Sequence, residues 1–370
     1  MIRGCRDEID TARQLPATIV EALRTAGVFR LLVPTRFGGY EVDPITFIKI
    51  IEEISAADGS AGWVASVCSV GGLLAGYMRE EAGMAIYGEN PDAIVAGGIN
   101  PTGKATAVDG GYLIQGKWAY GSGIRHADWV YGSCVVYDGE QTRLDAAGKA
   151  EIRLMLFPAT ACVVHDTWHV GGLRGTGSHD FSVSDLFIPS DRSLIAFAGG
   201  ALQPGILYRF PFSLFAALIA AIPLGIARGA ISALVELAKS KTPMGANTVL
   251  RERSSAQIAV ARAEALVRSG RAFLFEALRE MRSEIVESGE AGMRSRALLR
   301  IACTQAALSA AKAVDLMFEA GGATSVYTSS PLERCFRDVH AAKQHIAVSS
   351  TYFEVSGRVL LGLDPGTARF

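Results

Sequence analysis

The chain has 370 residues and a formal net charge of −1 at pH 7. Hydrophobic residues make up 49% of it and charged residues 20%, a balance that allows a large core and is typical of a globular protein with two or three domains. The near-neutral charge gives no electrostatic footprint for nucleic acid, so we predict no DNA or RNA partner.

The cysteines and the apolar segments bear on the compartment. Six cysteines are scattered without a CxxC pair, and their spacing fits neither a zinc site nor a disulfide framework. We therefore predict reduced thiols, a cytoplasmic location and no metal site. The first ten residues lack the apolar stretch of a signal peptide. The longest uncharged run, residues 210–227, is interrupted by Pro211 and Pro223 and predicts a buried bundle helix rather than a membrane span.

Three regions with different patterns follow one another along the chain. Residues 1–92 have helical spacing of apolar residues and predict an α-helical domain. Residues 93–203 contain short β-rich segments separated by turn signals such as DGG and IPSD, which predict an antiparallel sheet or a small barrel. Residues 204–370 contain four long amphipathic segments, as many as an antiparallel four-helix bundle needs. The sequence thus predicts an α+β fold.

Two helix starts are expected within the first region. Asp43 is suited to cap a helix, and Pro44 is suited to its first position. The segment ADGS then breaks the pattern, and we expect Ser60 to cap a second helix.

Polar groups gather in two glycine-rich stretches of the β region. Residues 116–129, GKWAYGSGIRHADW, combine strand alternation with loop glycines. Residues 171–180, GGLRGTGSHD, form either a plain loop between strands or a loop whose N–H groups and hydroxyls meet a phosphate or a ring carbonyl. No GxGxxG or GxxxxGK[ST] fingerprint is present. A cofactor is expected where sheet meets bundle, because pockets favour domain interfaces.

The histidines do not form an evident metal or catalytic set. His165 and His169 lie four apart in a predicted strand and turn, where that spacing does not share a face. His340 and His345 lie five apart in a predicted helix and would point away from each other. One of these two is free to face a cavity while the other faces a neighbouring helix.

Four stretches, taken together and in order, resemble one family. They are EISAADGSAGW (residues 53–63), GGYLIQGKWAYGSGIRHADW (110–129), GLRGTGSHDFSVSDLFIP (172–189) and SPLERCFRDVHAAKQH (330–345). The chain resembles the acyl-CoA dehydrogenase fold over its whole length, and within that fold the flavin-dependent monooxygenases, such as p-hydroxyphenylacetate hydroxylase, dibenzothiophene monooxygenase and the nitrososynthases. This resemblance implies an N-terminal α domain, a middle antiparallel β domain and a C-terminal four-helix bundle.

The last stretch separates the monooxygenases from the dehydrogenases. Dehydrogenases follow the equivalent of Arg337 and Asp338 with a glutamate base, at a position that falls at or beside His345 here. No carboxylate is present there, and the next one along the chain, Glu354, is nine residues further on. The monooxygenases resemble this chain in ending the motif with a histidine. The resemblance therefore makes His345 the first candidate for chemistry near the reactive edge of a flavin, where a group with a pKa near operating pH suits proton handling.

The resemblance implies the oxygenase component of a two-component monooxygenase. Such a protein takes FADH2 or FMNH2 from a separate flavin reductase and uses O2, through a C4a-(hydro)peroxide, to oxygenate a small aromatic, amine or heteroatom substrate. The alternatives are an acyl-CoA dehydrogenase-like dehydrogenase or oxidase, which needs a carboxylate base, and a homologue that binds no flavin.

Further site residues follow only from the resemblance. Ser122 would approach flavin N5 and Trp118 would pack on the ring, although a turn hydroxyl and a core tryptophan are the plainer interpretations. His126 would either reach the substrate or be structural. The loop residues Arg174, Thr176 and Ser178 would contact the flavin or its phosphate, or shape the pocket.

Two arginines of the bundle are candidates for a contact between subunits. Arg251 and Arg253 would meet a cofactor phosphate of a neighbouring subunit, because in this fold the site is completed across a dimer interface within a homotetramer. A solvated helix face is the alternative, since the chain lacks the RxxFG pattern of the dehydrogenases. FAD and FMN therefore both stay open.

Overall fold

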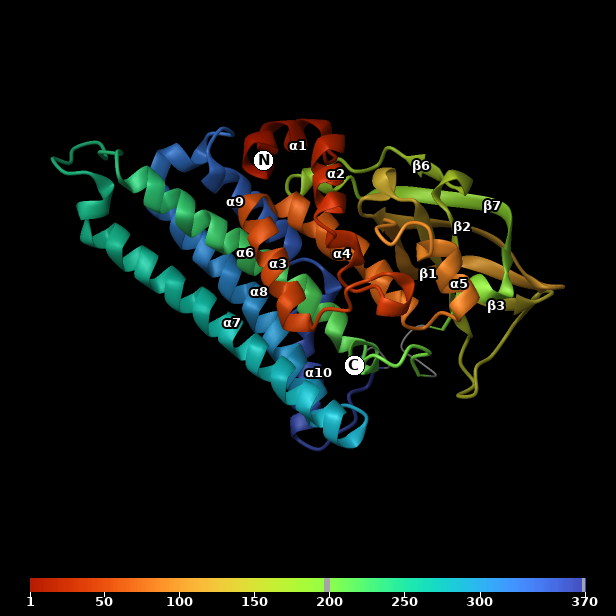
Figure 1. The fold of residues 1–370 in the computed structure, drawn as a ribbon. Coiled ribbons are helices and arrows are strands. Elements are labelled where there is room, and N and C mark those ends of the chain that lie inside the picture. The colour runs from red at the N-terminus through yellow and green to blue at the C-terminus, as the bar shows by residue number, and fades with distance from the viewer. Residues whose placement is uncertain (196–199, 368–369) are drawn as a thin grey trace.

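The computed structural model describes residues 1–195, 200–367 and 370. The N-terminal helices lie between a sheet and a bundle of long helices, with α3 and α4 in the middle of the molecule (Figure 1). The order of helices, sheet and helical bundle along the chain is the one predicted from the sequence. The N-terminal helices are α1 Arg6–Ala12, α2 Ala17–Thr25, α3 Pro44–Ala57, α4 Gly59–Ala75 and α5 Glu80–Tyr87.

Acidic caps begin the two central helices. Asp43 accepts hydrogen bonds from the N–H groups of Ile45 and Thr46, and Pro44 occupies the first position of α3, as predicted. The prediction for Ser60 is wrong, because Asp58 caps α4 by accepting from the N–H of Ala61. The Ser60 hydroxyl is thereby free to bond elsewhere in the fold.

The middle region forms one mixed sheet in the order β6-β7-β2-β1-β3-β5-β8, with β4 paired to β3. All of these pairings are antiparallel except β1 with β3, which is parallel. The purely antiparallel sheet expected from the sequence is corrected at this one pairing. After the β1–β2 hairpin the chain crosses to the other side of β1 before β3 starts. The strands are β1 Val95–Val108, β2 Gly111–Gly121, β3 Trp129–Asp138, β4 Gln141–Thr142, β5 Ile152–Pro158, β6 Val163–His165, β7 His179–Pro189 and β8 Ser193–Leu194.

The C-terminal region is a bundle in which the fourth segment is broken. Three long helices are followed by two shorter ones, which replace the single helix expected over residues 331–360. The break falls at His345, so the helical angle between His340 and His345 does not apply. The helices are α6 Ser213–Ala238, α7 Ser254–Ser288, α8 Met293–Gly321, α9 Pro331–Ala342 and α10 Thr351–Leu360, with the 3-10 turn η11 Ile346–Val348 before α10.

The most apolar helix, α6, runs through the bundle core. Pro223 lies inside α6 and does not end it, contrary to the interruption expected from the sequence. By length and composition α6 and the segment Met293–Val326 are both apolar enough to cross a membrane, but 89% and 67% of their apolar windows are buried inside the protein. Such burial is typical of core helices, and it confirms the predicted buried helix over most of residues 210–227.

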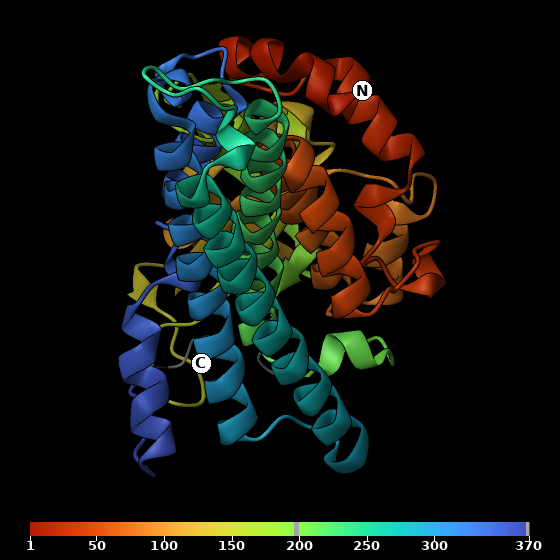
Figure 2. The ribbon, with the colours of Figure 1, turned by 90° about the vertical axis from the view of Figure 1, so that its left-hand side faces the viewer.

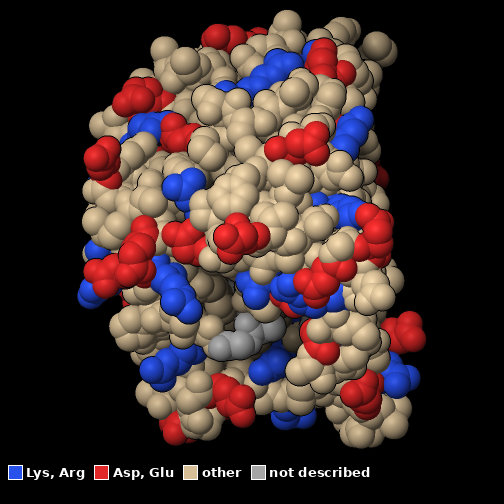
Figure 3. All heavy atoms as spheres, turned by 90° about the vertical axis from the view of Figure 1, so that its right-hand side faces the viewer, with Lys and Arg blue, Asp and Glu red and all other residues tan. Residues whose placement is uncertain are grey.

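The surfaces differ between the two ends of the molecule. Helix α7 lies outermost in the bundle (Figure 2) and buries few of its residues. The opposite end carries acidic and basic side chains interspersed over its face (Figure 3), in agreement with the net charge near zero.

Candidate active site

Four segments that are far apart in the sequence meet between the sheet and the bundle. Trp63 of α4 donates its indole N–H to the hydroxyl of Ser122, which follows β2 (3.0 Å). The same indole ring meets the imidazole of His345 edge-on, with ring centres 5.5 Å apart. The ring of Phe215 of α6 also meets that imidazole edge-on, with ring centres 5.7 Å apart. Thus one tryptophan contacts both Ser122 and His345.

A chain of hydroxyls leads inward from Ser122. The oxygens of Ser122 and Ser178 lie 2.7 Å apart, and those of Ser178 and Thr176 also lie 2.7 Å apart. Thr176 donates its single hydrogen to the carbonyl of Leu173 (2.9 Å), so Ser178 donates to Thr176 and Ser122 donates to Ser178. The Ser122 oxygen also accepts from Trp63, and its second lone pair is left to accept a hydrogen bond from a ligand.

The loop that carries Thr176 and Ser178 is attached to its surroundings by backbone groups. The N–H of Gly123 donates to the carbonyl of Thr176 (2.9 Å), which joins this loop to the end of β2. The N–H of Gly175 donates to the Ser60 hydroxyl (3.1 Å), the group that was expected to cap a helix. The loop lies between β6 and β7, as predicted, and Gly175–His179 are buried.

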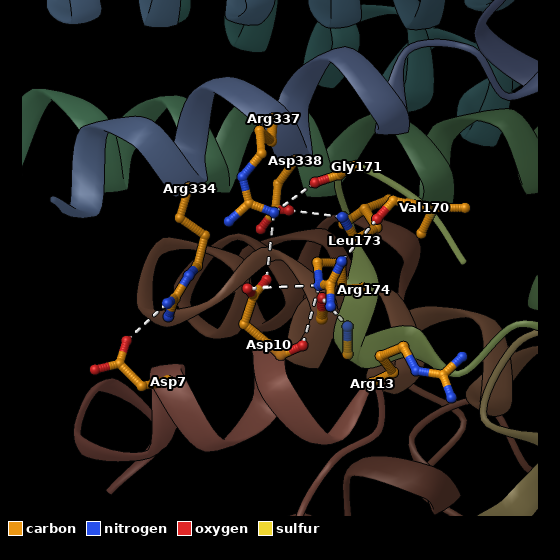
Figure 4. A network of polar contacts seen from close by, with 12 residues as sticks. Asp7, Asp10, Arg13, Val170, Gly171, Leu173, Arg174, Arg334, Arg337 and Asp338 are labelled. Carbon is orange, nitrogen blue, oxygen red and sulfur yellow. Dashed lines mark hydrogen bonds and ion pairs between the residues drawn. The ribbon is translucent and has the colours of Figure 1, made fainter. Parts of the chain in front are cut away.

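A buried acid holds the start of this loop. Asp338 of α9 accepts the N–H of Leu173 (2.6 Å), and Figure 4 shows the loop lying between α9 and α1. Burial, reinforced by the neighbouring Asp58, raises the pKa of Asp338 well above its usual range. Arg337 of the same helix donates to the carbonyl of Gly171. Arg337 and Asp338 of the sequence motif therefore position the loop that carries Thr176 and Ser178.

His345 is a neutral donor in this environment. Burial, with a contribution from the Arg300 cation, lowers its pKa to about 4. The N–H of Ala347 donates to Nδ1 (3.2 Å), so Nδ1 is the acceptor and the neutral ring carries its hydrogen on Nε2. At neutral pH His345 can donate a hydrogen bond from Nε2, but it is not an imidazolium acid. The expected pKa near operating pH is corrected by burial.

Arg300 of α8 is a charged group that the sequence reasoning missed. It is 1% exposed, and its Nε and Nη2 have no hydrogen-bond partner among the described residues. Its Cζ lies 3.2 Å from the centre of the Tyr352 ring. A desolvated cation–π contact contributes roughly 2 kcal/mol, whereas burying an unpaired ion costs several kcal/mol. The guanidinium is therefore incompletely compensated.

The predicted flavin-packing residue Trp118 is engaged by the protein itself. Trp118 is 1% exposed, donates to the Ser133 carbonyl (2.8 Å) and stacks on Phe181, so its predicted packing on a flavin is wrong in this geometry. A Cβ at any of four glycines around it, Gly98, Gly103, Gly116 and Gly132, would come within 3 Å of its side chain. Trp118 is therefore a core tryptophan, which was the plainer interpretation of its sequence position.

Arg174 and His126 lie at the edge of the constellation. The guanidinium of Arg174 donates to the carbonyls of Asp10 (3.1 Å) and Val170 (3.2 Å) and thus faces α1 (Figure 4). Its role is to hold the loop, and a flavin contact stays a prediction. Burial, followed by the charge of Arg125, lowers the pKa of the half-buried His126. A substrate contact for His126 also stays a prediction.

Arg251 and Arg253 lie far from His345 within the chain. They belong to the α6–α7 connection, which Figure 1 shows at the end of the bundle away from the sheet. Both are exposed, and Arg253 lines a hollow of about 440 Å³ together with Met244, Leu250 and Glu319. They can reach a flavin only in another subunit, so their predicted role remains a prediction.

Family models and known relatives match this arrangement. The acyl-CoA dehydrogenase N-terminal domain matches residues 2–83 and the C-terminal domain matches residues 217–350. Indole-3-acetate monooxygenase of Pseudomonas putida is 34% identical, over 99% of this chain and 93% of its own. The chain belongs to the flavin-dependent monooxygenases of the acyl-CoA dehydrogenase fold.

Other members of this monooxygenase family agree with the assignment. The oxygenase component of the FADH(2)-dependent resorcinol hydroxylase of Rhizobium sp. (strain MTP-10005) is 31% identical, over 99% of this chain and 92% of its own. The crystal structure of 3-HSA hydroxylase from Rhodococcus sp. RHA1 has a TM-score of 0.91 at 28% identity, covering 100% and 96% of the two chains. XiaF from Streptomyces sp., solved with FADH2 and glycerol, has a TM-score of 0.90 at 26% identity, covering 99% and 93%.

The residues of this monooxygenase fit a reduced flavin. The Ser122 oxygen is an acceptor and the Nε2–H of His345 a donor, which suits a reduced ring that carries N–H groups and carbonyls, and Trp63 and Phe215 supply apolar ring surface beside them. The sequence stretch that ends in Trp63 supported the resemblance, but Trp63 was not among the predicted site residues. A tryptophan at the end of that motif was the one signal that pointed to it.

Proposed function

We propose that this monooxygenase is the oxygenase component of a two-component system that accepts FADH2 from a separate reductase. Bound reduced flavin would supply electrons and activate O2 as a C4a-(hydro)peroxide, and one oxygen atom would pass to a small aromatic substrate. Relatives named as oxygenase components or subunits support the separate reductase. Relatives named for indole-3-acetate and resorcinol support an aromatic substrate.

The observation that carries the proposal is the pairing of Ser122 and His345 through Trp63. Ser122 presents a free lone pair and His345 an N–H donor, and no carboxylate among the described residues hydrogen-bonds to either of them. Glu354, the next acid after His345 along the sequence, is exposed on α10. A dehydrogenase needs a base that removes a carbon-bound proton, whereas this pair is suited to donate to an oxygen and to accept from an N–H group.

The protein's own part in the reaction is positioning, hydrogen bonding and exclusion of water. His345 would donate from Nε2 to an oxygen atom that bears developing charge, and Ser122 would accept a hydrogen bond from a ring N–H group. The rings of Trp63 and Phe215 would keep water from the reacting atoms, which protects an oxygen intermediate from hydrolytic loss. In this proposal His345 stays neutral throughout.

A coupled assay tests the proposal. The protein is mixed with FAD, a separate flavin reductase, NADH and air, and indole-3-acetate, 3-methylindole and resorcinol are offered as substrates. We expect at least one compound to gain one oxygen atom, as measured by mass spectrometry, and no product when oxidised FAD replaces the reductase system.

Two outcomes would contradict the proposal. One is that NADH oxidation yields only hydrogen peroxide with every compound. The other is that acyl-CoA compounds reduce bound oxidised flavin, which would favour the dehydrogenase alternative.

The remaining assignments rest on the resemblance and the composition. We propose a cytoplasmic homotetramer in which Arg251 and Arg253 reach the cofactor of a neighbouring subunit. The exposed α6–α7 connection and the hollow beside Arg253 support such a contact.

A further inference from the structure

The free atoms of Arg300 form one edge of its guanidinium. Both Nε and Nη2 are buried, and neither has a hydrogen-bond partner among the described residues, while the face of the group is covered by the Tyr352 ring. The hydrogens on Nε and Nη2 point in the same direction, and this edge matches the two oxygens of a carboxylate in parallel hydrogen bonds. In the part of the chain that the structure describes, the groups that act on Arg300 are Cys303 and Tyr352, the latter also through a hydrogen bond, and neither is a carboxylate that would match the charge.

Arg300 faces the segment that carries His345. Thr304 lies four residues further along α8, on the same side of the helix. Its hydroxyl donates to the carbonyl of Ser349 (3.2 Å), which directly follows η11. The Arg300 cation also contributes to the lowered pKa of His345. These two observations place Arg300, which belongs to the bundle, near the segment that carries His345.

We propose that Arg300 binds the carboxylate of an aromatic acid whose ring lies beside His345. This inference rests on the proposed function, since it names the substrate class of the same site. The aromatic ring would lie among Trp63, Phe215 and His345, and the acid group would extend toward α8. The carboxylate would complete both the hydrogen bonds and the charge that the folded chain leaves unmatched.

Binding measurements test the proposal without turnover. Indole-3-acetate and 3-methylindole share a ring and differ in the carboxylate, so the ratio of their Kd values isolates the acid group. Calorimetry is done on the protein alone and with anaerobic FADH2. We expect the wild type to bind the acid at least about tenfold more tightly, and R300M to weaken acid binding by about 100-fold while 3-methylindole is unchanged.

Two further variants guard against a trivial loss of folding. R294M removes an exposed arginine of the same helix and should leave both ligands unaffected. R300K keeps the positive charge but loses the two parallel N–H donors of the guanidinium, and it should retain only part of the preference for the acid. The ligand-free Tm of R300M should equal or exceed that of the wild type, because a buried unpaired charge is removed.

Several outcomes would overturn the assignment. R300M could leave the ratio of the two Kd values unchanged, or it could lower the ligand-free Tm and weaken both ligands alike, which would make Arg300 structural. A loss of affinity for reduced FMN but not for reduced riboflavin would assign Arg300 to the flavin phosphate instead. Oxygenation of resorcinol with an unchanged Kd ratio would retain the proposed function and reject the inference. Acid binding that depends on Arg300, without oxygenation of any substrate, would retain the inference and reject the proposed function.

Discussion

At the scale of single residues, Trp63 determines which lone pair of the Ser122 oxygen is left for a ligand. The Trp63 N–H occupies one lone pair, and the hydrogen of the Ser122 hydroxyl is donated to Ser178. We expect W63F to lower the fraction of reduced flavin that ends in oxygenated product by about fivefold, the value of one neutral hydrogen bond. Because Trp63 acts through Ser122, the W63F/S122A double variant should be no worse than S122A. Additive losses would contradict this positioning role.

A second residue-scale prediction concerns the protonation of His345. Its folded pKa of about 4 lies below the value of about 6.5 expected in the unfolded chain. The folded state is therefore favoured above the unfolded pKa, and that contribution is lost as the pH falls from about 6.5 toward about 4. We expect H345Q to flatten this part of the pH dependence of the unfolding free energy.

Direct titration of the imidazole gives the decisive control for that prediction. The ring should stay neutral at pH 6 when followed by nuclear magnetic resonance, with the H345Q spectrum identifying its signal. An imidazole of His345 that becomes protonated above pH 6 would contradict the neutral-donor role.

The sequence was sufficient to single out His345 and Ser122, but it could not reveal Trp63 or Arg300. The first two lie in recognisable motifs, whereas the roles of the other two depend on contacts between distant segments. Trp63 and Ser122 are 59 positions apart. Nε and Nη2 of Arg300 lack a hydrogen-bond partner among the described residues, and this becomes evident only in the folded structure. Trp118 is the opposite case. It lies in a recognisable motif, but in the structure it packs in the core of the sheet and donates to the Ser133 carbonyl.

At the scale of elements, the loop between β6 and β7 must pack closely on α9. A Cβ at Gly172 would come within 2.2 Å of the Arg337 carbonyl oxygen, whereas a Cβ at the neighbouring Gly171 would meet nothing within 4 Å. We expect G172A to lower the unfolding free energy by about 1–3 kcal/mol and to reduce product formation by displacing Thr176 and Ser178. Chemical denaturation and the coupled assay measure both effects.

The adjacent substitution G171A is the matched control for the loop. It should leave stability and product formation close to those of the wild type. Equal effects of the two substitutions would show that the loop does not depend on its contact with α9.

Periodicity alone could not locate the break in the fourth bundle segment. Residues 331–360 read as one amphipathic helix, but α9 ends at Ala342 and α10 begins at Thr351. His345 caps the intervening turn through its own ring, so the residue that we propose as a hydrogen-bond donor to the reacting group also shapes the break. Similarly, alternation predicted the strands but not the parallel pairing of β1 with β3, which follows from a long-range crossover.

At the scale of the whole molecule, the order of helices, sheet and bundle was predicted from the sequence because each region has its own periodicity. How subunits meet was not, because exposed residues such as Arg251 and Arg253 carry no pattern that distinguishes an interface from a solvated surface. Their distance from His345 within one chain makes any role in cofactor binding a property of the assembly.

The assembly prediction has a direct test in cofactor affinity. We expect the charge reversal R251E/R253E to weaken binding of FADH2 by about tenfold or more, as loss of phosphate contacts should, while reduced riboflavin binds as before. R282E, an exposed arginine elsewhere on α7, is the control. Equal losses for both flavins, or none for either, would contradict contact with a phosphate.

The central claim is that this chain transfers an oxygen atom from O2 by means of reduced flavin. It is tested most directly by supplying isotope-labelled O2 to the protein with FADH2 and the best substrate of the coupled assay. The molecular mass of the product is then measured by mass spectrometry. The account predicts one labelled oxygen per product molecule, with none from labelled water. An unlabelled product, or labelled hydrogen peroxide alone, would contradict it.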